Sequence, residues 1–189
     1  MSFLDTLRKF SKMICVVFVV LLHLFLAVMV NFAFPHYDKA LITGGEVKRM
    51  DKDGLIDASN PADGPTRDVY FIYTKQEVGD KVMPYRNEDT RWGFPFYFKF
   101  NSADLQARAQ SFAGSQKAVQ IKFYGWRIAM FDEFRNAVSI KELGENEQIA
   151  RPVMSYVFYV ILLVSMIIWI RAVFRFFRQE TKQVGETAK

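Results

Sequence analysis

The densest cluster of charged side chains in the sequence places two carboxylates, Glu88 and Asp89, between two guanidiniums, Arg86 and Arg91. Carboxylate oxygens are ligands for divalent cations, and a carboxyl group with a raised pKa can act as a general acid or base. The guanidiniums can instead clamp a phosphate or a carboxylate through paired hydrogen bonds. The cluster therefore has residue types suited to an enzyme, to a metal site or to recognition.

The spacing within this cluster favours recognition over catalysis. Neighbouring side chains of an extended chain point to opposite sides, so Glu88 and Asp89 are poorly placed to face one reacting atom together. Tyr85 and Trp92 flank the charges, and Trp, Tyr and Arg are enriched in protein-binding hot spots. The alternative is a loop whose charges pair with each other and whose Trp92 covers the core.

A second cluster follows Gly125, where Trp126 is joined to Arg127. Arg beside Trp is typical of a partner-facing hot spot and equally of cation–π packing within a fold. We predict one interaction surface built from both clusters, with these members: Tyr85, Arg86, Glu88, Asp89, Arg91, Trp92, Trp126 and Arg127.

The sequence predicts neither a catalytic set nor a cofactor. Nucleophilic triads, phosphate-binding loops and zinc-ligand spacings are missing, and the two histidines are His23 and His36. The one cysteine, Cys15, lies in an apolar run, so disulfides cannot staple the rest of the chain. We therefore expect a protein that is not an enzyme, without catalytic, cofactor-binding or metal-binding residues. An enzyme or metal site at Glu88 and Asp89 stays open as the alternative.

Two apolar runs, residues 13–34 and 153–170, predict transmembrane helices. A bilayer core about 30 Å thick needs about 20 apolar residues in a helix that rises about 1.5 Å per residue, and the runs have 22 and 18 residues. A cleaved signal peptide is the alternative for the first run, although the run is longer than a typical hydrophobic region of such a peptide.

The distribution of charge orients these two spans. Residues 1–12 carry a net charge of +2 and residues 171–189 a net charge of +3, whereas residues 35–152 carry 17 Lys and Arg against 17 Asp and Glu. Basic residues close to span ends favour the cytoplasmic side. We therefore predict a bacterial inner-membrane protein with both termini in the cytoplasm and residues 35–152 in the periplasm.

His23 lies near the middle of the first span and is a candidate intramembrane polar site. An ionisable residue at that depth is a functional hypothesis by default, here an oligomeric proton or ion path. The alternative, which we favour, is a neutral imidazole that is hydrogen-bonded to Tyr159 or Ser165 of the second span, or to another copy. Neither apolar run contains an acidic residue that could take up a relayed proton.

Both cytoplasmic ends have the pattern of membrane-surface segments. Residues 1–12 predict a short interfacial helix with apolar residues on one face. In the basic tail, residues 171–189, positive side chains recur at steps of four, three and four, and anionic headgroups attract such charges. This lipid-facing basic stripe comprises Arg171, Arg175, Arg178 and Lys182.

The segment between the spans, residues 35–152, predicts one small β-rich domain. Alternating or continuous apolar patterns predict strands at residues 43–52, 69–74, 94–100, 119–123 and 138–140, and a helix at residues 102–112. Three strands, one helix and two strands match the element order of a five-stranded OB barrel, with a small α+β sandwich as the alternative. The fold class is an α+β membrane protein in which two transmembrane helices flank this domain.

The block YRNEDT-x-WG-x-P-x-YFKF at residues 85–100, followed by SADLQA at residues 102–107, resembles a family of small bacterial and prophage membrane proteins of unknown function. The resemblance covers most of the chain and implies an inner-membrane protein without catalytic residues. The size and two-span plan are also loosely similar to prophage superinfection-exclusion proteins, which interfere with DNA delivery by incoming phages.

From these observations we expect a membrane-anchored periplasmic module that binds or interferes with another envelope protein. The expected partners are membrane lipids, including anionic headgroups, and an envelope or incoming phage protein. Basic residues with interleaved aromatics can also bind nucleic acid, but beside a span they favour lipid, so no nucleic acid is expected. A homo-oligomer is left open.

Overall fold

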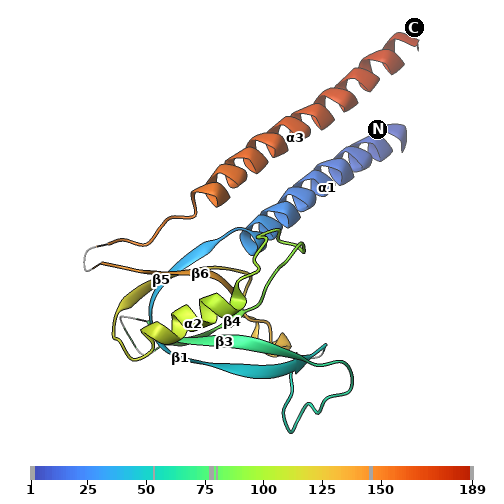
Figure 1. The fold of residues 1–189 in the computed structure, drawn as a ribbon. Coiled ribbons are helices and arrows are strands. Elements are labelled where there is room, and N and C mark those ends of the chain that lie inside the picture. Colours follow the sequence, from blue (N-terminus) through green and yellow to red (C-terminus); the bar gives the residue numbers. More distant parts are fainter. Residues whose placement is uncertain (1–2, 53, 77–78, 80, 145–146, 188–189) are drawn as a thin grey trace. The chain divides into compact units, whose positions relative to one another are not determined.

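A computed structural model describes residues 3–52, 54–76, 79, 81–144 and 147–187, with the side chains of residues 3–5 and 179–187 excepted (Figure 1). The chain divides into two compact units. One consists of Met1–Asn31 and Val153–Lys189, and the other of Phe32–Pro152. Each unit is described by itself.

The first unit is made of two long helices, α1 (Phe3–Ala33) and α3 (Val153–Thr187). Both predicted apolar runs are therefore helical. The stretches Thr6–Ala33 and Val153–Arg178 are long and apolar enough to cross a membrane. At about 1.5 Å per residue, either stretch exceeds the roughly 30 Å of a bilayer core.

The second unit contains a six-stranded sheet and the helix α2 (Ser102–Phe112). The α+β class is therefore confirmed for the described residues. The strand order is β2-β1-β3-β4-β6-β5, and β1 also pairs with β5. The strands are β1 (His36–Asp51), β2 (Gly54–Leu55), β3 (Arg67–Gln76), β4 (Val82–Asn87), β5 (Ala118–Tyr124) and β6 (Asn136–Glu142).

Strand β1 is long enough to serve two neighbours. Its first residues, from His36 to Leu41, pair antiparallel with β5, and residues from Ala40 onward pair antiparallel with β3. The register shifts between Ile42 and Gly44, and a bulge of this kind bends a strand and increases its twist. Strands β4 and β6 pair parallel through Arg86 and Asn136. The polar cluster at residues 85–89 therefore begins inside the sheet.

Helix α2 packs on β1 and β3 and covers the main core (Figure 1). Its inward face presents Leu105, Gln106 and Ala109, which fits the predicted helix at residues 102–112. Gly45 of β1 permits the close approach, because a Cβ there would lie 2.6 Å from Gln106 Nε2 and 2.7 Å from the carbonyl oxygen of Phe71. The principal apolar cluster comprises Ala40, Ile42, Ile72, Tyr85, Leu105, Ala109, Val119, Ile121, Phe123, Ala137 and Ile140.

One strand lies elsewhere than the sequence predicts. The strands predicted at residues 69–74, 119–123 and 138–140 fall within β3, β5 and β6. The strand predicted at residues 94–100 is wrong, because that segment has no regular structure and Phe96 and Phe98 have positive φ. The strand before α2 is instead β4, which tolerates Pro84 because β4 pairs with β6 only at Arg86.

Candidate functional site

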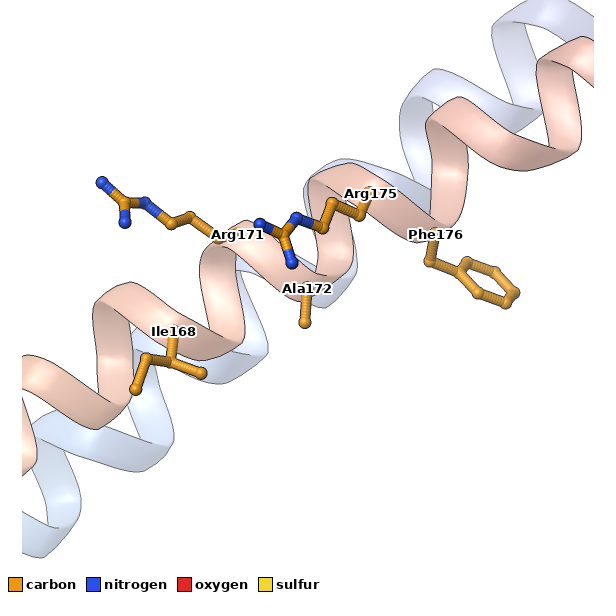
Figure 2. Close-up of a pocket in the computed structure, with 5 residues that line it drawn as sticks. All are labelled: Ile168, Arg171, Ala172, Arg175 and Phe176. Carbon is orange, nitrogen blue, oxygen red and sulfur yellow. The ribbon is translucent and has the colours of Figure 1, made fainter.

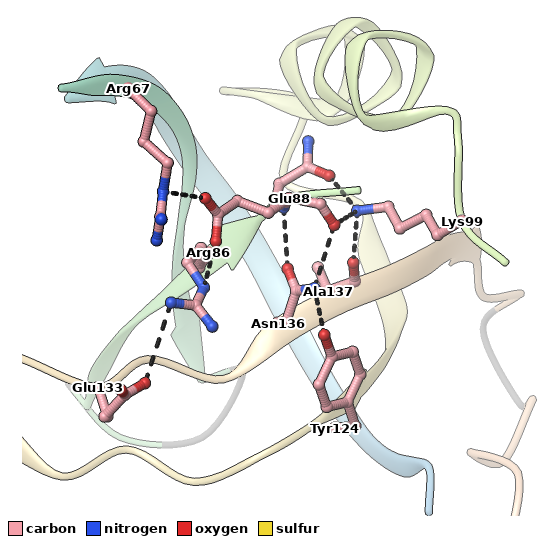
Figure 3. A network of polar contacts seen from close by, with 9 residues as sticks. Arg67, Arg86, Glu88, Lys99, Tyr124, Glu133, Asn136 and Ala137 are labelled. Atoms are coloured by element: carbon pink, nitrogen blue, oxygen red, sulfur yellow. Dashed lines mark hydrogen bonds and ion pairs between the residues drawn. The ribbon is translucent and has the colours of Figure 1, made fainter. Parts of the chain in front are cut away.

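Glu88 lies between two guanidiniums and is held by both. Arg67 Nε is 2.9 Å from Glu88 Oε1, and Arg86 Nε is 3.0 Å from Glu88 Oε2 (Figure 3). The contact with Arg86 is an ion pair without hydrogen-bond geometry. Arg86 Nη1 also lies 3.9 Å from a carboxylate oxygen of Glu133. Within the cluster, Arg86 and Glu88 therefore pair, as the alternative interpretation of the sequence expected of its charges. The other half of that interpretation is wrong, because Trp92 is 75% exposed and does not cover the core.

Lys99 is a buried cation of the same region, and its burial could not be predicted from the sequence. Its side chain is 4% exposed. Its Nζ donates to the carbonyl oxygens of Ala137, at 2.8 Å, and Glu88, at 3.2 Å, and to Asn87 Oδ1 (Figure 3). Three protons thus meet three acceptors. Burial lowers the pKa of Lys99 to about 8, against the opposing effect of the Asp89 and Glu88 charges.

Two buried amides complete this network. Asn136 Nδ2 donates to the Tyr124 hydroxyl at 2.8 Å and to the carbonyl oxygen of Glu88 at 3.1 Å, and its Oδ1 accepts from the Glu88 N–H at 2.9 Å (Figure 3). Asn87 Nδ2 donates to the Ser102 carbonyl oxygen at 2.8 Å and to Gln106 Oε1 at 3.1 Å. Buried amides are costly unless they are satisfied. Here they join β4, β6 and α2, so the network has a structural role.

Tyr85 and Asp89 also stabilise the fold from within. Tyr85 is 1% exposed, so it lies beneath the predicted interaction surface and not on it. Its hydroxyl donates to Asp38 Oδ2 at 2.5 Å, and Arg135 Nη1 donates to the same oxygen at 2.9 Å. Burial raises the pKa of Tyr85. Asp89 Oδ1 accepts from the Ser102 N–H at 2.9 Å and so satisfies a free donor at the start of α2.

Arg91 and Trp92 are exposed and lie in a different setting. They lie in the loop between β4 and α2, where the Arg91 N–H donates to the carbonyl oxygen of Lys99 at 3.0 Å. The Trp92 ring meets the edges of Phe98 and Phe100 at centroid distances of 5.4 and 5.6 Å. The two predicted surface residues are therefore part of an aromatic loop.

Trp126 lines a cavity of about 250 Å³. The Phe32 ring meets the edge of Trp126 at a centroid distance of 5.2 Å. Arg127 stacks its guanidinium 4.1 Å from the centre of the Phe134 ring and donates to the carbonyl oxygen of Glu133 at 3.0 Å. Arg127 thus makes the cation–π contact that the sequence left open. The lining residues are Phe32, Arg86, Tyr124, Gly125, Trp126, Ile128, Glu133 and Phe134.

This cavity brings together members of both predicted clusters. Arg86 comes from β4, whereas Trp126 comes from the loop after β5, and both reach the same hollow. Gly125 begins that loop with φ +81, a conformation that residues with a Cβ rarely adopt. Sequence reasoning missed Phe134 and Ile128, which resemble ordinary core residues.

A model of a family described as proteins of unknown function, DUF1523, matches residues 11–177. The chain belongs to the DUF1523 family. A relative from Haemophilus influenzae, described as an uncharacterized protein, is 56% identical over 165 residues, which make up 87% of this chain and 94% of the relative. No solved structure matches the chain. Neither the family's description nor this relative's name assigns an activity.

His23 of this DUF1523 chain is satisfied within the helical unit. Its Nδ1 is 2.7 Å from the Val19 carbonyl oxygen, and its Nε2 is 2.8 Å from Ser165 Oγ. A carbonyl oxygen can only accept, so Nδ1 carries a proton and donates to Val19. The Ser165 hydroxyl also lies 3.1 Å from the carbonyl oxygen of Leu162. Nearby, Asn31 Nδ2 donates to the Tyr159 hydroxyl at 3.3 Å. Of the partners expected for His23, which were Tyr159, Ser165 or another copy, the structure shows Ser165.

The basic stripe of the DUF1523 chain lies on α3. Arg171, Arg175 and Arg178 are exposed, and the side chain of Lys182 lies outside the described part of the structure. Figure 2 shows Arg171 and Arg175 one turn apart, beside a shallow hollow lined by Ile168, Ala172 and Phe176. All the lining residues belong to one helix, so this hollow is a groove between neighbouring side chains and not an enclosed ligand site.

In the part of the chain that the structure describes, no other side chain joins Glu88 and Asp89 to complete a metal site. Among the described residues, no three His, Cys, Asp or Glu side chains are grouped so that they could hold a metal ion. Glu88 points at Arg67 and Arg86, whereas Asp89 accepts from the first turn of α2. The two carboxylates of this DUF1523 chain therefore serve different neighbours.

Proposed function

We propose that the chain is a non-enzymatic, membrane-anchored module that binds another envelope polypeptide through the cavity beside Trp126. One observation carries the proposal: residues from β4, from the end of β5 and from the loop after β5 converge on a hollow with mainly apolar walls. Trp, Tyr and Arg together are the residue types that dominate binding energy at protein interfaces.

The size of the cavity favours a single side chain of a partner. Sites for small organic ligands have volumes of about 300–1,000 Å³, and this hollow has about 250 Å³. Trp126, Ile128 and Phe134 offer apolar contact, while Arg86 and Glu133 offer one polar edge. An aliphatic or aromatic side chain of an extended polypeptide fits this chemistry.

The residues at the rim of the cavity, Met130 and Phe131, favour a protein partner over nucleic acid. Met130 and Phe131 are 82% and 66% exposed, in a loop whose ends, Ile128 and Glu133, form a β-bridge. Large exposed apolar side chains next to a pocket mark interaction sites. Residues 35–152 carry equal numbers of acidic and basic residues, whereas binding to a phosphate backbone relies on an excess of positive charge.

The strand pairing supports an OB-like barrel for this domain. The order β1-β3-β4-β6-β5 returns to β1 through the β1–β5 pairing, and α2 follows the third of these strands along the chain. OB-folds bind ligands with the second and third strands and with the loops after the first and fourth. The loop after β5 is the fourth-strand loop, and it carries Trp126. This support is by analogy of fold, which does not by itself specify function.

Exposure and charge support the membrane anchor. A core helix of a soluble protein buries its apolar side chains, but Phe18, Phe25 and Ile168 are 59–65% exposed. The excess of basic residues at both ends of the chain supports a topology in a bacterial inner membrane with both termini in the cytoplasm and residues 35–152 in the periplasm.

Site-specific photocrosslinking in intact cells tests the proposal. A photoreactive phenylalanine replaces Phe131 at the rim, and the same group at Val47, an exposed position of β1, is the control. We expect a discrete adduct from position 131 only, and its loss when Trp126→Ala removes one wall of the cavity. An adduct of equal yield in the Trp126→Ala chain, with an unchanged circular dichroism spectrum, would show that the cavity is not the binding site.

Superinfection exclusion is a specific form of this proposal. It predicts that cells that express the chain resist a tailed phage and that Trp126→Ala restores plaque formation. If the Trp126→Ala cells stayed fully resistant to the phage, exclusion would not depend on the cavity.

A further inference from the structure

An aromatic loop, residues 91–100, directs every second side chain outward. Its five exposed aromatic side chains have exposed fractions from 52% to 75%. They are Trp92, Phe94, Phe96, Phe98 and Phe100. Between them, Lys99 turns inward and is buried. The alternation therefore separates a face that holds the fold together from a face that is entirely aromatic.

The aromatic loop is closed and anchored at its base. The Arg91 N–H donates to the Lys99 carbonyl oxygen, and the Lys99 N–H donates to Thr90 Oγ1 at 3.1 Å. Its rings contact one another, with centroid distances of 5.4 Å for Trp92–Phe98 and 5.8 Å for Phe94–Phe96. The exposed rings therefore form one contiguous patch, which is unusual on a surface that faces only water.

Two contacts place this patch beside the last residues of α1. The Tyr97 hydroxyl donates to the carbonyl oxygen of Ala33 at 2.9 Å. The Phe94 ring stacks on Phe32 at a centroid distance of 6.4 Å. Ala33 is the final residue of the apolar stretch that is long enough to cross a membrane. The aromatic loop consequently lies where that stretch ends.

We propose that the aromatic loop inserts its rings into the bilayer interface next to the end of α1. The proposal rests on the proposed function only in requiring that α1 crosses the bilayer. At that depth, the amphipathic ring of Trp92 gains from contact with the headgroups, and the apolar Phe rings gain from contact with the upper acyl region. Arg91 is exposed at the start of the loop and is suited to a lipid phosphate. Bilayer contact would hold the domain close to the membrane surface.

Tryptophan quenching in the full chain tests this insertion. Trp126→Phe with Trp169→Phe leaves Trp92 as the single tryptophan. The chain is reconstituted in phosphatidylcholine and phosphatidylglycerol liposomes with or without brominated acyl chains. The matched control adds Val47→Trp to a chain in which all three tryptophans are Phe. Val47 is exposed and follows His36 by 11 residues of β1, which is about 35 Å of strand.

We expect brominated lipid to quench Trp92 several-fold more strongly than the tryptophan at position 47, and aqueous acrylamide to show the reverse order. Acrylamide quenching of Trp92 equal to that of the control, without lipid quenching, would overturn the proposal. Protection of Trp92 from both quenchers would also overturn it, in favour of a second copy or another protein over the loop.

A chain that keeps only Trp169, in α3, separates this proposal from the membrane anchor. If brominated lipid quenches Trp169 but not Trp92, the loop insertion is wrong and the anchor stands. If neither is quenched, the membrane anchor fails and the insertion fails with it.

Discussion

Lys99 Nζ donates a hydrogen bond to the carbonyl oxygen of Ala137, 2.8 Å away, and thereby ties the aromatic loop to β6. The bond joins a buried ammonium group to backbone that already belongs to the sheet. The outward rings of the loop therefore depend on an inward charge, and that charge is costly to bury. Its cost has a measurable dependence on pH.

Raising the pH is expected to stabilise the domain through Lys99. The folded pKa, about 8, is below the ordinary 10.5, so between these values the unfolded chain binds more protons than the folded one. The free energy of unfolding therefore rises with pH in this window, by about 2 kcal/mol from pH 7 to about pH 9.5. Thermal unfolding of the full chain in detergent, followed by near-ultraviolet circular dichroism, measures this rise.

Lys99→Met is the control for that pH dependence. Met fills similar space without a titrating group, so the rise with pH should be lost even if the variant is less stable at every pH. Burial raises the pKa of both Tyr85 and Tyr97. These two groups therefore lower the free energy of unfolding as the pH rises, and they do so only at a pH above the window in which Lys99 titrates. An equal slope in the wild type and in Lys99→Met would assign the pH dependence to other groups.

Gly45→Ala should destabilise the packing of α2 on β1. The new Cβ would lie 2.7 Å from the Phe71 carbonyl oxygen, which cannot move without disturbing β3. Overpacking of this kind costs about 1–3 kcal/mol. The neighbouring Gly44→Ala is the matched control, because a Cβ there meets nothing within 4 Å. Denaturant unfolding measures the free energy of unfolding of both full-length variants. Equal losses of stability in Gly45→Ala and Gly44→Ala would contradict this account.

Apolar patterning was sufficient to predict much of the fold. Helix α2 and strands β3, β5 and β6 have a periodic burial that can be read from residue types alone, and the two apolar runs predict α1 and α3 in the same way. Strand β4 was missed because Pro84 and the charges after it resemble a turn. Only its pairing with β3 on one side and, through Arg86, with β6 on the other makes it a strand.

The site was harder to predict because its decisive side chains are polar and buried. Asn87, Lys99 and Asn136 are 0–4% exposed, although Asn and Lys are usually surface residues. Their burial depends on acceptors that other elements supply: Ala137 of β6 for Lys99, α2 for Asn87, and Tyr124 and Glu88 for Asn136. The alternating Phe residues of the aromatic loop caused the opposite error. Their alternation predicted a half-buried strand, whereas the structure has an irregular loop with exposed rings.

Glu88→Gln should lower the free energy of unfolding by an intermediate amount. The change leaves Arg67 and Arg86 without their shared carboxylate. Breaking a fully buried ion pair costs about 3–5 kcal/mol and an exposed one at most about 1, and Glu88 has a side chain 24% exposed. We expect a loss of about 1–2 kcal/mol, measured by denaturant unfolding, with Asp63→Asn, at an exposed pair, as the control.

The same carboxylates allow a direct test of the metal alternative. Because Glu88 and Asp89 serve different neighbours, the double variant Glu88→Gln, Asp89→Asn should leave the binding of Mn²⁺ by the full chain unchanged in equilibrium dialysis. Saturable Mn²⁺ binding that the double variant abolishes would restore the metal interpretation.

Replacement of His23 should weaken the contact between α1 and α3 without changing proton flux. The ring joins the Val19 carbonyl oxygen to the Ser165 hydroxyl, so both nitrogens are already engaged. Polar contacts between membrane helices are worth about 0.6 kcal/mol on average, and we expect His23→Leu to cost about 1 kcal/mol in thermal unfolding in detergent. Ser165→Ala, which leaves Nε2 without this partner, should cost a similar amount.

In liposomes with an imposed pH gradient and an internal pH-sensitive dye, the wild type and both variants should leak protons no faster than protein-free liposomes. A wild-type leak that His23→Leu abolishes would instead establish a proton path through this residue.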